Sequence, residues 1–210
     1  MKAFWNRYSY NTVKLFINQF AISIFGAMLS FVAVSIGNSV LTIVLSAFSA
    51  LFYLFLIYTL MWEVGATDKI SVDVGKRPYR PFTGLYMALF ANIPNFLVAL
   101  IFTAVHPFSA SYEWAGNICG VLKGVAFIPL HGIYNGIMMV LKIGDTALHD
   151  FWWAYFLMTL PSLFVCFMAY YLGHRNFKFF GFITSPKKGR QQKIMHPLHR
   201  IRIARIRCFY

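Results

Sequence analysis

Charged side chains are scarce in this chain: only 12% of its 210 residues are Asp, Glu, Lys or Arg, against about 25% in soluble domains. Acidic residues are the scarcest, at six, and they stand at the ends of apolar stretches or between them. No pair of carboxylates therefore lies inside an apolar stretch, which excludes an acid–base dyad there. Hydrophobic residues make up 59% of the chain instead.

Cysteines and catalytic motifs are also lacking. The three cysteines show neither the spacing of a metal site nor that of a disulfide framework, and we interpret them as small buried hydrophobic residues. The Gly-x-Ser-x-Gly, His-Glu-x-x-His, phosphate-loop and Cys-x-x-Cys patterns are absent. The sequence therefore assigns no catalytic residue, metal or cofactor, and it favours a function other than catalysis.

Long apolar stretches dominate what is present. A bilayer core about 30 Å thick needs roughly 20 apolar residues in a helix that rises 1.5 Å per residue. Five stretches reach that length, which predicts an all-α integral membrane protein built as a helical bundle. We expect one transmembrane domain over residues 16–173, an N-terminal segment 1–15 and a basic tail 174–210. The stretches are 16–36, 40–61, 82–105, 116–144 and 151–172.

The positive charges gather in three places: before the first stretch, after the second, and in the tail. Eight of the 19 Lys and Arg residues lie between positions 187 and 207. Residues 37–38 and 106–115 carry none. Because Lys and Arg concentrate on the cytoplasmic side of membrane proteins, we expect both termini to be cytoplasmic.

Five full crossings would place the termini on opposite sides of the membrane, so one stretch must cross an even number of times or not at all. The stretch 116–144 is the candidate, because its 29 residues would form a helix about 43 Å long. Pro129 near its middle removes a backbone donor and clashes with the preceding turn. We expect this stretch to be broken or re-entrant at Pro129. An interfacial segment and an ordinary kinked span are the alternatives.

Glycines flank Pro129 at a spacing of four residues. Small residues at that spacing let helix backbones approach one another closely. We therefore expect these glycines to contact neighbouring helices, so that a large side chain there would disrupt packing. The glycines are Gly120, Gly124, Gly132 and Gly136.

Polar side chains inside the apolar stretches are the candidates for a ligand site. Lys123 and His131 are ionisable, and Asn135 continues their spacing. Such residues are costly in lipid and usually face the bundle interior or water. Asn92 and Asn95 join them if the third stretch turns inward. The five predict a lining for a small ligand or ion, with Lys123 as a fixed positive charge. Alternatively, Lys123 extends to an interface and His131 caps a broken helix.

The segment between the second and third stretches combines acidic and basic residues. Lys69 and Arg77-Pro78 are similar to the opening motif of membrane lipid phosphatases. The spacing is one residue too long and the Ser-Gly-His element is absent, so we exclude that family. We expect Asp68 and Asp73 to pair with nearby Lys and Arg in a solvated cytoplasmic loop, where such pairs contribute little energy.

The polybasic tail predicts partners of its own. A basic run next to a span is attracted to anionic lipid headgroups by about 1 kcal/mol per charge near the surface. Ribosomal RNA is the alternative partner, since basic tails bind phosphate without sequence preference. The lipid bilayer and other membrane subunits complete the expected partners.

Several short patterns follow one another along the chain: Trp62-Glu63-x-Gly65-x-x-Asp68, Gly75-x-Arg77-x-x-x-Pro81-x-x-Gly84-Leu85, Pro94, and Tyr171-Leu172-Gly173-His174-Arg175. This order resembles small uncharacterised polytopic membrane proteins of Gram-positive bacteria and covers about half of the chain. The resemblance implies a bacterial cell (inner) membrane and no particular activity.

These patterns together favour a transport-related or accessory membrane component. A ribosome- or nascent-chain-associated membrane factor that uses the basic tail is one alternative. A membrane enzyme that acts on lipid is the other.

Overall fold

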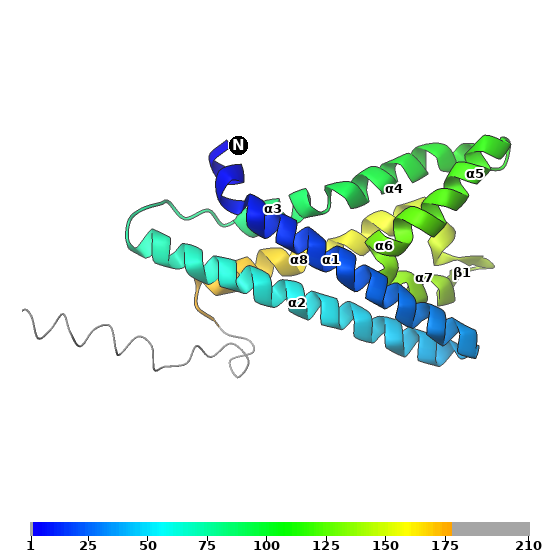
Figure 1. The fold of residues 1–210 in the computed structure, drawn as a ribbon, viewed down its shortest axis with the longest axis horizontal. Helices are drawn as coiled ribbons and strands as arrows, with labels where there is room; N and C mark the ends of the chain where they lie inside the picture. The colour runs from blue at the N-terminus through cyan, green and yellow to red at the C-terminus, as the bar shows by residue number, and fades with distance from the viewer. Residues whose placement is uncertain (1, 178–210) are drawn as a thin grey trace, which may run out of the picture. The chain divides into compact units, whose positions relative to one another are not determined.

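The computed structural model describes residues 2–177, and these form an all-α bundle, which confirms the predicted fold class (Figure 1). A bent pair of helices, Thr83–Ala91 and Ile93–Phe108, meets at 54° and would count as a further span if its two parts cross together. The basic tail from residue 178 onward lies outside the described residues. The helical segments long and apolar enough to cross a membrane are Phe4–Ile36, Ser39–Asp73, Glu113–Val140 and Trp152–His174.

Large apolar side chains cover the outside of the bundle. Soluble monomers rarely expose extended apolar surface, whereas helices in a bilayer turn such side chains toward lipid. The outward faces of the first two helices therefore suit a membrane environment. Examples with exposed fractions between 55% and 67% are Met28, Val32, Val44, Phe48 and Leu51.

Helices α1 (Lys2–Ile36) and α2 (Ser39–Asp73) form an antiparallel pair. Gly37 takes a φ of +74°, which lets the chain reverse tightly, and the Asn38 side chain accepts hydrogen bonds from the first amides of α2. Small buried residues line the adjoining sides of the pair, where Gly26 meets Ser49 and where residues 130–137 pack. These residues are Ser23, Gly26, Ala27, Ser30, Ala33, Thr42, Ser46 and Ser49.

The third apolar stretch bends at Asn92. Helix α3 (Thr83–Ala91) ends there and α4 (Ile93–Val105) begins, and the Asn92 side-chain amide donates to the Ala88 carbonyl at 2.9 Å. Pro94 lies in the first turn of α4, where its missing N–H is not needed. A 3₁₀ turn, His106–Phe108, then leads away from α4.

The stretch after α4 enters the bundle and turns back. Helix α5 (Glu113–Val121) starts beside the 3₁₀ turn that ends α4. The Leu130 carbonyl accepts a hydrogen bond from Ser23, midway along α1, at 3.1 Å. The Gly136 amide then donates to Ser30, nearer the α1–α2 turn, also at 3.1 Å. In Figure 1, α5 and β1 accordingly lie toward the same end, with α6 deeper in the bundle.

Helical geometry changes repeatedly along this stretch. Pro129 lies inside α6, and the carbonyl four residues before it belongs to the preceding π-helical turn, where the regular i→i−4 ladder is already interrupted. The predicted break is confirmed, but it lies just after Pro129, in a 3₁₀ turn. Because the π turn before the proline already interrupts the regular hydrogen bonds, α6 continues through Pro129. The successive elements are η2 (Leu122–Ala126), α6 (Phe127–His131), η3 (Gly132–Tyr134) and α7 (Asn135–Val140).

Two of the four predicted glycine contacts exist. A Cβ added at Gly132 would overlap the Ser23 carbonyl oxygen, and one at Gly136 would lie 3.0 Å from side chains of both α1 and α2. The prediction is wrong at Gly120 and Gly124, where no described atom of a neighbour lies within 4 Å of an added Cβ. Both of these glycines lie on the exposed face of their helical segment.

A short hairpin joins α7 to the last helix. Strands β1 (Lys142–Ile143) and β2 (Thr146–Ala147) pair antiparallel, and Gly144 supplies a φ of +66° at the turn. A 3₁₀ turn, Leu148–Asp150, follows and brings Asp150 back toward the broken stretch.

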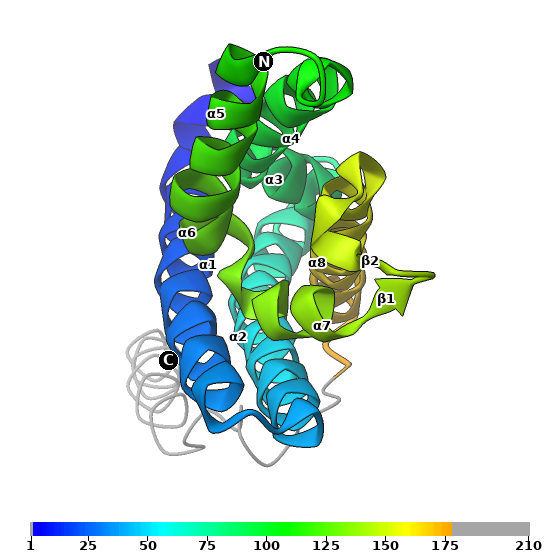
Figure 2. The ribbon, with the colours of Figure 1, turned by 90° about the vertical axis from the view of Figure 1, so that its right-hand side faces the viewer.

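Helix α8 (Trp152–His174) packs along α2, and in Figure 2 α2 lies between α1 and α8. Two glycines permit this close approach. A Cβ at Gly65 would overlap the Tyr170 carbonyl oxygen, and a Cβ at Gly173 would overlap the Trp62 carbonyl oxygen. The two backbones therefore touch at the end of the bundle where α2 and α8 both finish.

Candidate functional site

A cavity of about 240 Å³, which we call the Lys123 cavity, lies between the broken stretch and the start of α8. Three of the predicted site residues line it: Lys123, His131 and Asn135. His149 and Tyr155 add further polar groups. The remaining wall is largely apolar and consists of Phe31, Gly124, Ile128, Met138 and Met139.

An ion pair positions Lys123. Its ammonium contacts the Asp150 carboxylate, and the same carboxylate oxygen lies 3.5 Å from His149 Nε2. The Lys123 ammonium also lies 5.7 Å from the centroid of the Phe102 ring, a cation–π arrangement. Both charged side chains are about one third exposed, at 31% for Lys123 and 36% for Asp150. The charged part of the cavity is therefore partly exposed at the surface of the bundle instead of being sealed in the interior.

The surroundings of Asp150 shift its pKa. Burial raises the pKa, but the hydrogen bond from Lys123 and the positive charges of His149, Lys123 and His106 outweigh burial and hold the pKa below its ordinary value of 3.8. Asp150 is thus an anion at neutral pH, and its pair with Lys123 is present there.

Replacing Asp150 with Asn should lower thermal stability at neutral pH and have little effect in acid. Because the folded-state pKa is depressed, the pair stabilises the fold above pH 3.8 and is lost as the pH falls through the lowered pKa. We expect a loss of about 1 kcal/mol or less, since the pair is partly exposed. Melting temperatures of both proteins against pH would measure it, with Asp145→Asn in the exposed hairpin turn as control. An effect independent of pH would contradict this role.

His131 also borders a second, much smaller cavity of about 10 Å³, which Asn92 and Asn95 help to line. The Asn92 Oδ1 accepts hydrogen bonds from Gln19 Nε2 at 3.2 Å and from Asn95 Nδ2 at 2.8 Å. This network joins α1 to the bend between α3 and α4. A space of that size holds at most about one water molecule, so it cannot take a larger solute.

The five predicted site residues therefore fall into two groups. Lys123, His131 and Asn135 line the cavity of about 240 Å³. Asn92 and Asn95 instead line the small cavity of about 10 Å³, which His131 also borders. Binding of a ligand by these residues stays a prediction.

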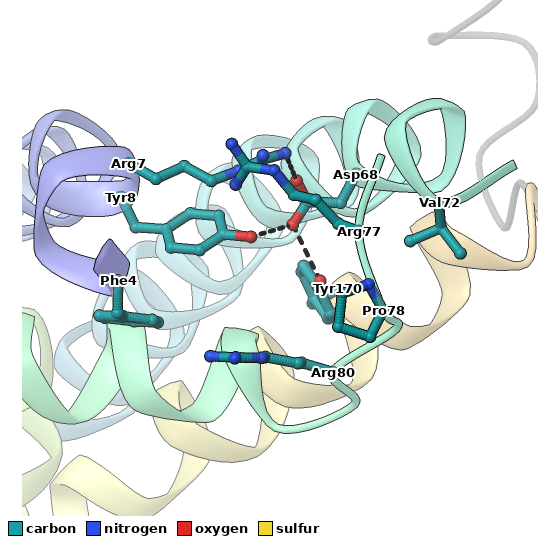
Figure 3. A pocket seen from close by; sticks show the side chains of 9 residues that line it. All are labelled: Phe4, Arg7, Tyr8, Asp68, Val72, Arg77, Pro78, Arg80 and Tyr170. Carbon is teal, nitrogen blue, oxygen red and sulfur yellow. Dashed lines mark hydrogen bonds and ion pairs between the residues drawn. The ribbon is translucent and has the colours of Figure 1, made fainter. Parts of the chain in front are cut away.

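Asp68 forms a second polar site, which the sequence patterns did not reveal. The residue is only 5% exposed, and its carboxylate accepts hydrogen bonds from three groups (Figure 3). These are the Arg7 guanidinium, the Tyr8 hydroxyl at 2.5 Å and the Tyr170 hydroxyl at 2.9 Å. The expectation of an exposed pair in a solvated loop is wrong for Asp68. Helix α2 continues past Met61 and turns this residue toward α1 and α8.

A pocket of about 270 Å³ surrounds this carboxylate, and we call it the arginine pocket. Arg77 and Arg80 reach it from the loop between α2 and α3, and Arg80 extends toward Phe4 of α1 (Figure 3). The complete lining is Phe4, Arg7, Tyr8, Asp68, Val72, Arg77, Pro78, Arg80 and Tyr170.

One local pattern in the sequence could have predicted that Asp68 is buried. Trp62, Gly65 and Asp68 follow one another at three-residue steps and all lie on the buried face of α2, so the helical period continues beyond the apolar stretch. The partner could not have been located in this way, because Arg7 is 61 residues away in the chain.

The fold is that of an all-α protein whose helices are long and apolar enough to cross a membrane. No protein-family model, curated protein or solved structure matches the chain. Within residues 2–177, no three His, Cys, Asp or Glu side chains gather where they could hold a metal ion.

Proposed function

We propose that this protein is a transport-related or accessory component of the cell membrane and that it binds a small solute in the Lys123 cavity. The path of residues 113–140, which turn back inside the bundle through a π turn and a 3₁₀ turn, carries the proposal. Irregular backbone at membrane depth is tolerated where it is buried in protein or lines a wet cavity. Interrupted helices of this kind form the substrate sites of many transporters.

The lining indicates what kind of solute would fit. Lys123 supplies a positive charge, Asn135 supplies an amide, and the methionine and phenylalanine side chains supply apolar contact. The Asn135 Nδ2 makes no hydrogen bond to another described residue, so it has a donor to offer. These features suit a small molecule with an anionic or hydrogen-bond-accepting end and an apolar remainder.

The distribution of charge supports an orientation. Arg7 near the start of α1, Lys69 near the end of α2 and Arg175 just after α8 belong to one end of the bundle, and Lys76, Arg77 and Arg80 lie in the α2–α3 loop at that end. We therefore assign that end to the cytoplasm, together with both termini. The Lys123 cavity then lies toward the outer face.

Cysteine labelling tests whether the Lys123 cavity is open to water. In a variant with its native cysteines replaced by alanine, Asn135→Cys should react with a membrane-impermeant methanethiosulfonate added from outside. Ser111→Cys in the exposed loop should react fully, and Thr159→Cys, at a residue that is only 3% exposed, should not react. Failure of Asn135→Cys to react from either side would contradict a solute site.

The charge of the cavity can be measured with the same variant. Relative to Ser111→Cys, Asn135→Cys should react preferentially with the negatively charged sulfonatoethyl reagent over the positively charged trimethylammonium reagent. Lys123→Ala should lower this preference several-fold, because removal of Lys123 leaves Asp150 without its positive partner. Lys142→Ala in the exposed hairpin is the matched control and should leave the preference unchanged.

A further inference from the structure

The arginine pocket contains more positive than negative charge. Arg7, Arg77 and Arg80 line it beside a single carboxylate, that of Asp68, whose oxygens are already occupied by Arg7 and two tyrosine hydroxyls. Among residues 2–177, no carboxylate oxygen lies within 4.0 Å of the Arg77 or Arg80 nitrogens. Two guanidinium groups therefore line the pocket without an acidic partner in the described part of the chain.

Guanidinium groups have a chemical preference that limits the ligand class. Their planar, paired N–H donors match the oxygens of phosphate and carboxylate, and they stay charged at every relevant pH. Arg77 and Arg80 come from one loop and line the same pocket, and a phosphate offers three or more oxygens to such donors. The pocket thus suits a phosphate-bearing group.

Another cavity, of about 380 Å³, adjoins the arginine pocket and shares Phe4 and Arg80 with it. We call it the aromatic cavity, because its lining is dominated by aromatic rings. Phe82 and Tyr86 are each 52% exposed, so this cavity borders the outer surface of α3. The other lining residues are Tyr79, Pro81, Thr83 and Phe90.

We propose that these adjoining cavities bind one anionic phospholipid, with its phosphate in the arginine pocket and the start of its acyl chains in the aromatic cavity. The lining changes from charged in the arginine pocket to largely aromatic in the aromatic cavity, as a phospholipid changes from its phosphate to its acyl chains. The arginines lie in and beside the loop at the end of the apolar helices, where headgroups lie. Phe82, Tyr86 and Phe90 follow at the start of α3 and along it, where acyl chains begin.

The aromatic cavity selects a lipid over a soluble phosphate. A free phosphate would contact the arginines alone, whereas a phospholipid also covers the exposed faces of Phe82 and Tyr86. This site is separate from the Lys123 cavity, so either proposal can fail without the other.

Lipid binding can be measured on the full-length protein in a neutral detergent. Phosphatidylglycerol should raise the melting temperature and remain bound in native mass spectrometry, more strongly than phosphatidylcholine at the same concentration. The double variant Arg77→Gln and Arg80→Gln should weaken the apparent affinity for phosphatidylglycerol about tenfold or more, since each lost contact is charge-assisted. Both arginine side chains are exposed, so the lipid-free protein should keep its stability.

Two further variants separate the site from general surface charge. Lys69→Gln with Lys76→Gln removes the same charge from the same end of the bundle, but neither lysine lines either cavity. This control should leave the preference for phosphatidylglycerol intact. Phe82→Ser should weaken phosphatidylglycerol binding while the arginine pocket is preserved, because it removes apolar contact only.

Three results would overturn the proposal. One is an equal loss of affinity in the lysine control, which would assign the effect to the surface potential. Another is equal stabilisation by glycerol 3-phosphate, which would show that a soluble phosphate suffices. The last is retention of phosphatidylglycerol by the double arginine variant at the level of the wild type.

Discussion

Replacing Gly132 with Ala should destabilise the protein strongly. An added Cβ would overlap the Ser23 carbonyl oxygen and lie 2.8 Å from the Ala27 Cβ, so the broken stretch would have to move away from α1. Overpacking of this kind typically costs about 1–3 kcal/mol, and here the obstacle is backbone, which yields less readily than a side chain. The hydrogen bond from Ser23 to the Leu130 carbonyl would be strained by the same movement. Melting of the purified protein in detergent would measure the loss.

Gly120→Ala is the matched control for that prediction. Gly120 belongs to α5, in the same broken stretch, and no described atom of a neighbour lies within 4 Å of an added Cβ. Alanine is the better helix former by about 1 kcal/mol, so this variant should be as stable as the wild type or more stable. Equal melting temperatures for Gly120→Ala and Gly132→Ala would refute the close contact between the broken stretch and α1.

The helices and the broken stretch followed from local patterns in the sequence. The positions of the helices could be predicted because they depend on apolar runs, but their lengths could not: α1 (Lys2–Ile36) and α2 (Ser39–Asp73) extend well beyond the stretches 16–36 and 40–61. The position of the break could not be predicted from Pro129 alone. It depends on a π turn before the proline and on contacts with Ser23, which is 107 residues from Leu130 in the chain.

The candidate sites were predictable to different degrees. Lys123, His131 and Asn135 share one cavity, as their four-residue spacing on a helix suggests. Asp150, which pairs with Lys123, arrives through a hairpin and a 3₁₀ turn whose course is decided by packing. Local spacing therefore indicated which side chains gather on a face, and long-range packing decided what that face meets.

The partners of Asp68 could be predicted even less well from the local sequence. Its neighbours in sequence, Lys69 and Asp73, suggested a charged loop, yet the side chain is buried and bonded to residues from α1 and α8. Ion pairs between such distant segments leave no periodic signal in either one. They become visible only when the helices are placed side by side.

Replacing Asp68 with Ala should be among the most damaging single changes in the described chain. It would leave the Arg7 guanidinium and the Tyr8 and Tyr170 hydroxyls without their shared acceptor at a position where the Asp68 side chain is only 7% exposed. Removing one partner of a buried ion pair typically costs about 3–5 kcal/mol. The loss would appear as a large fall in melting temperature, whereas Asp73→Ala, at the exposed end of α2, should have little effect.

A second substitution distinguishes the lost charge pair from lost packing. If the penalty comes from an unpaired Arg7, then Arg7→Met combined with Asp68→Ala should be more stable than Asp68→Ala alone, because no buried charge remains. Recovery should be partial, since Tyr8 and Tyr170 still lack their acceptor. A double variant no more stable than Asp68→Ala would show that Arg7 is solvated without Asp68. The carboxylate would then matter chiefly as the acceptor that joins the two tyrosines, and with them α1 and α8, to α2.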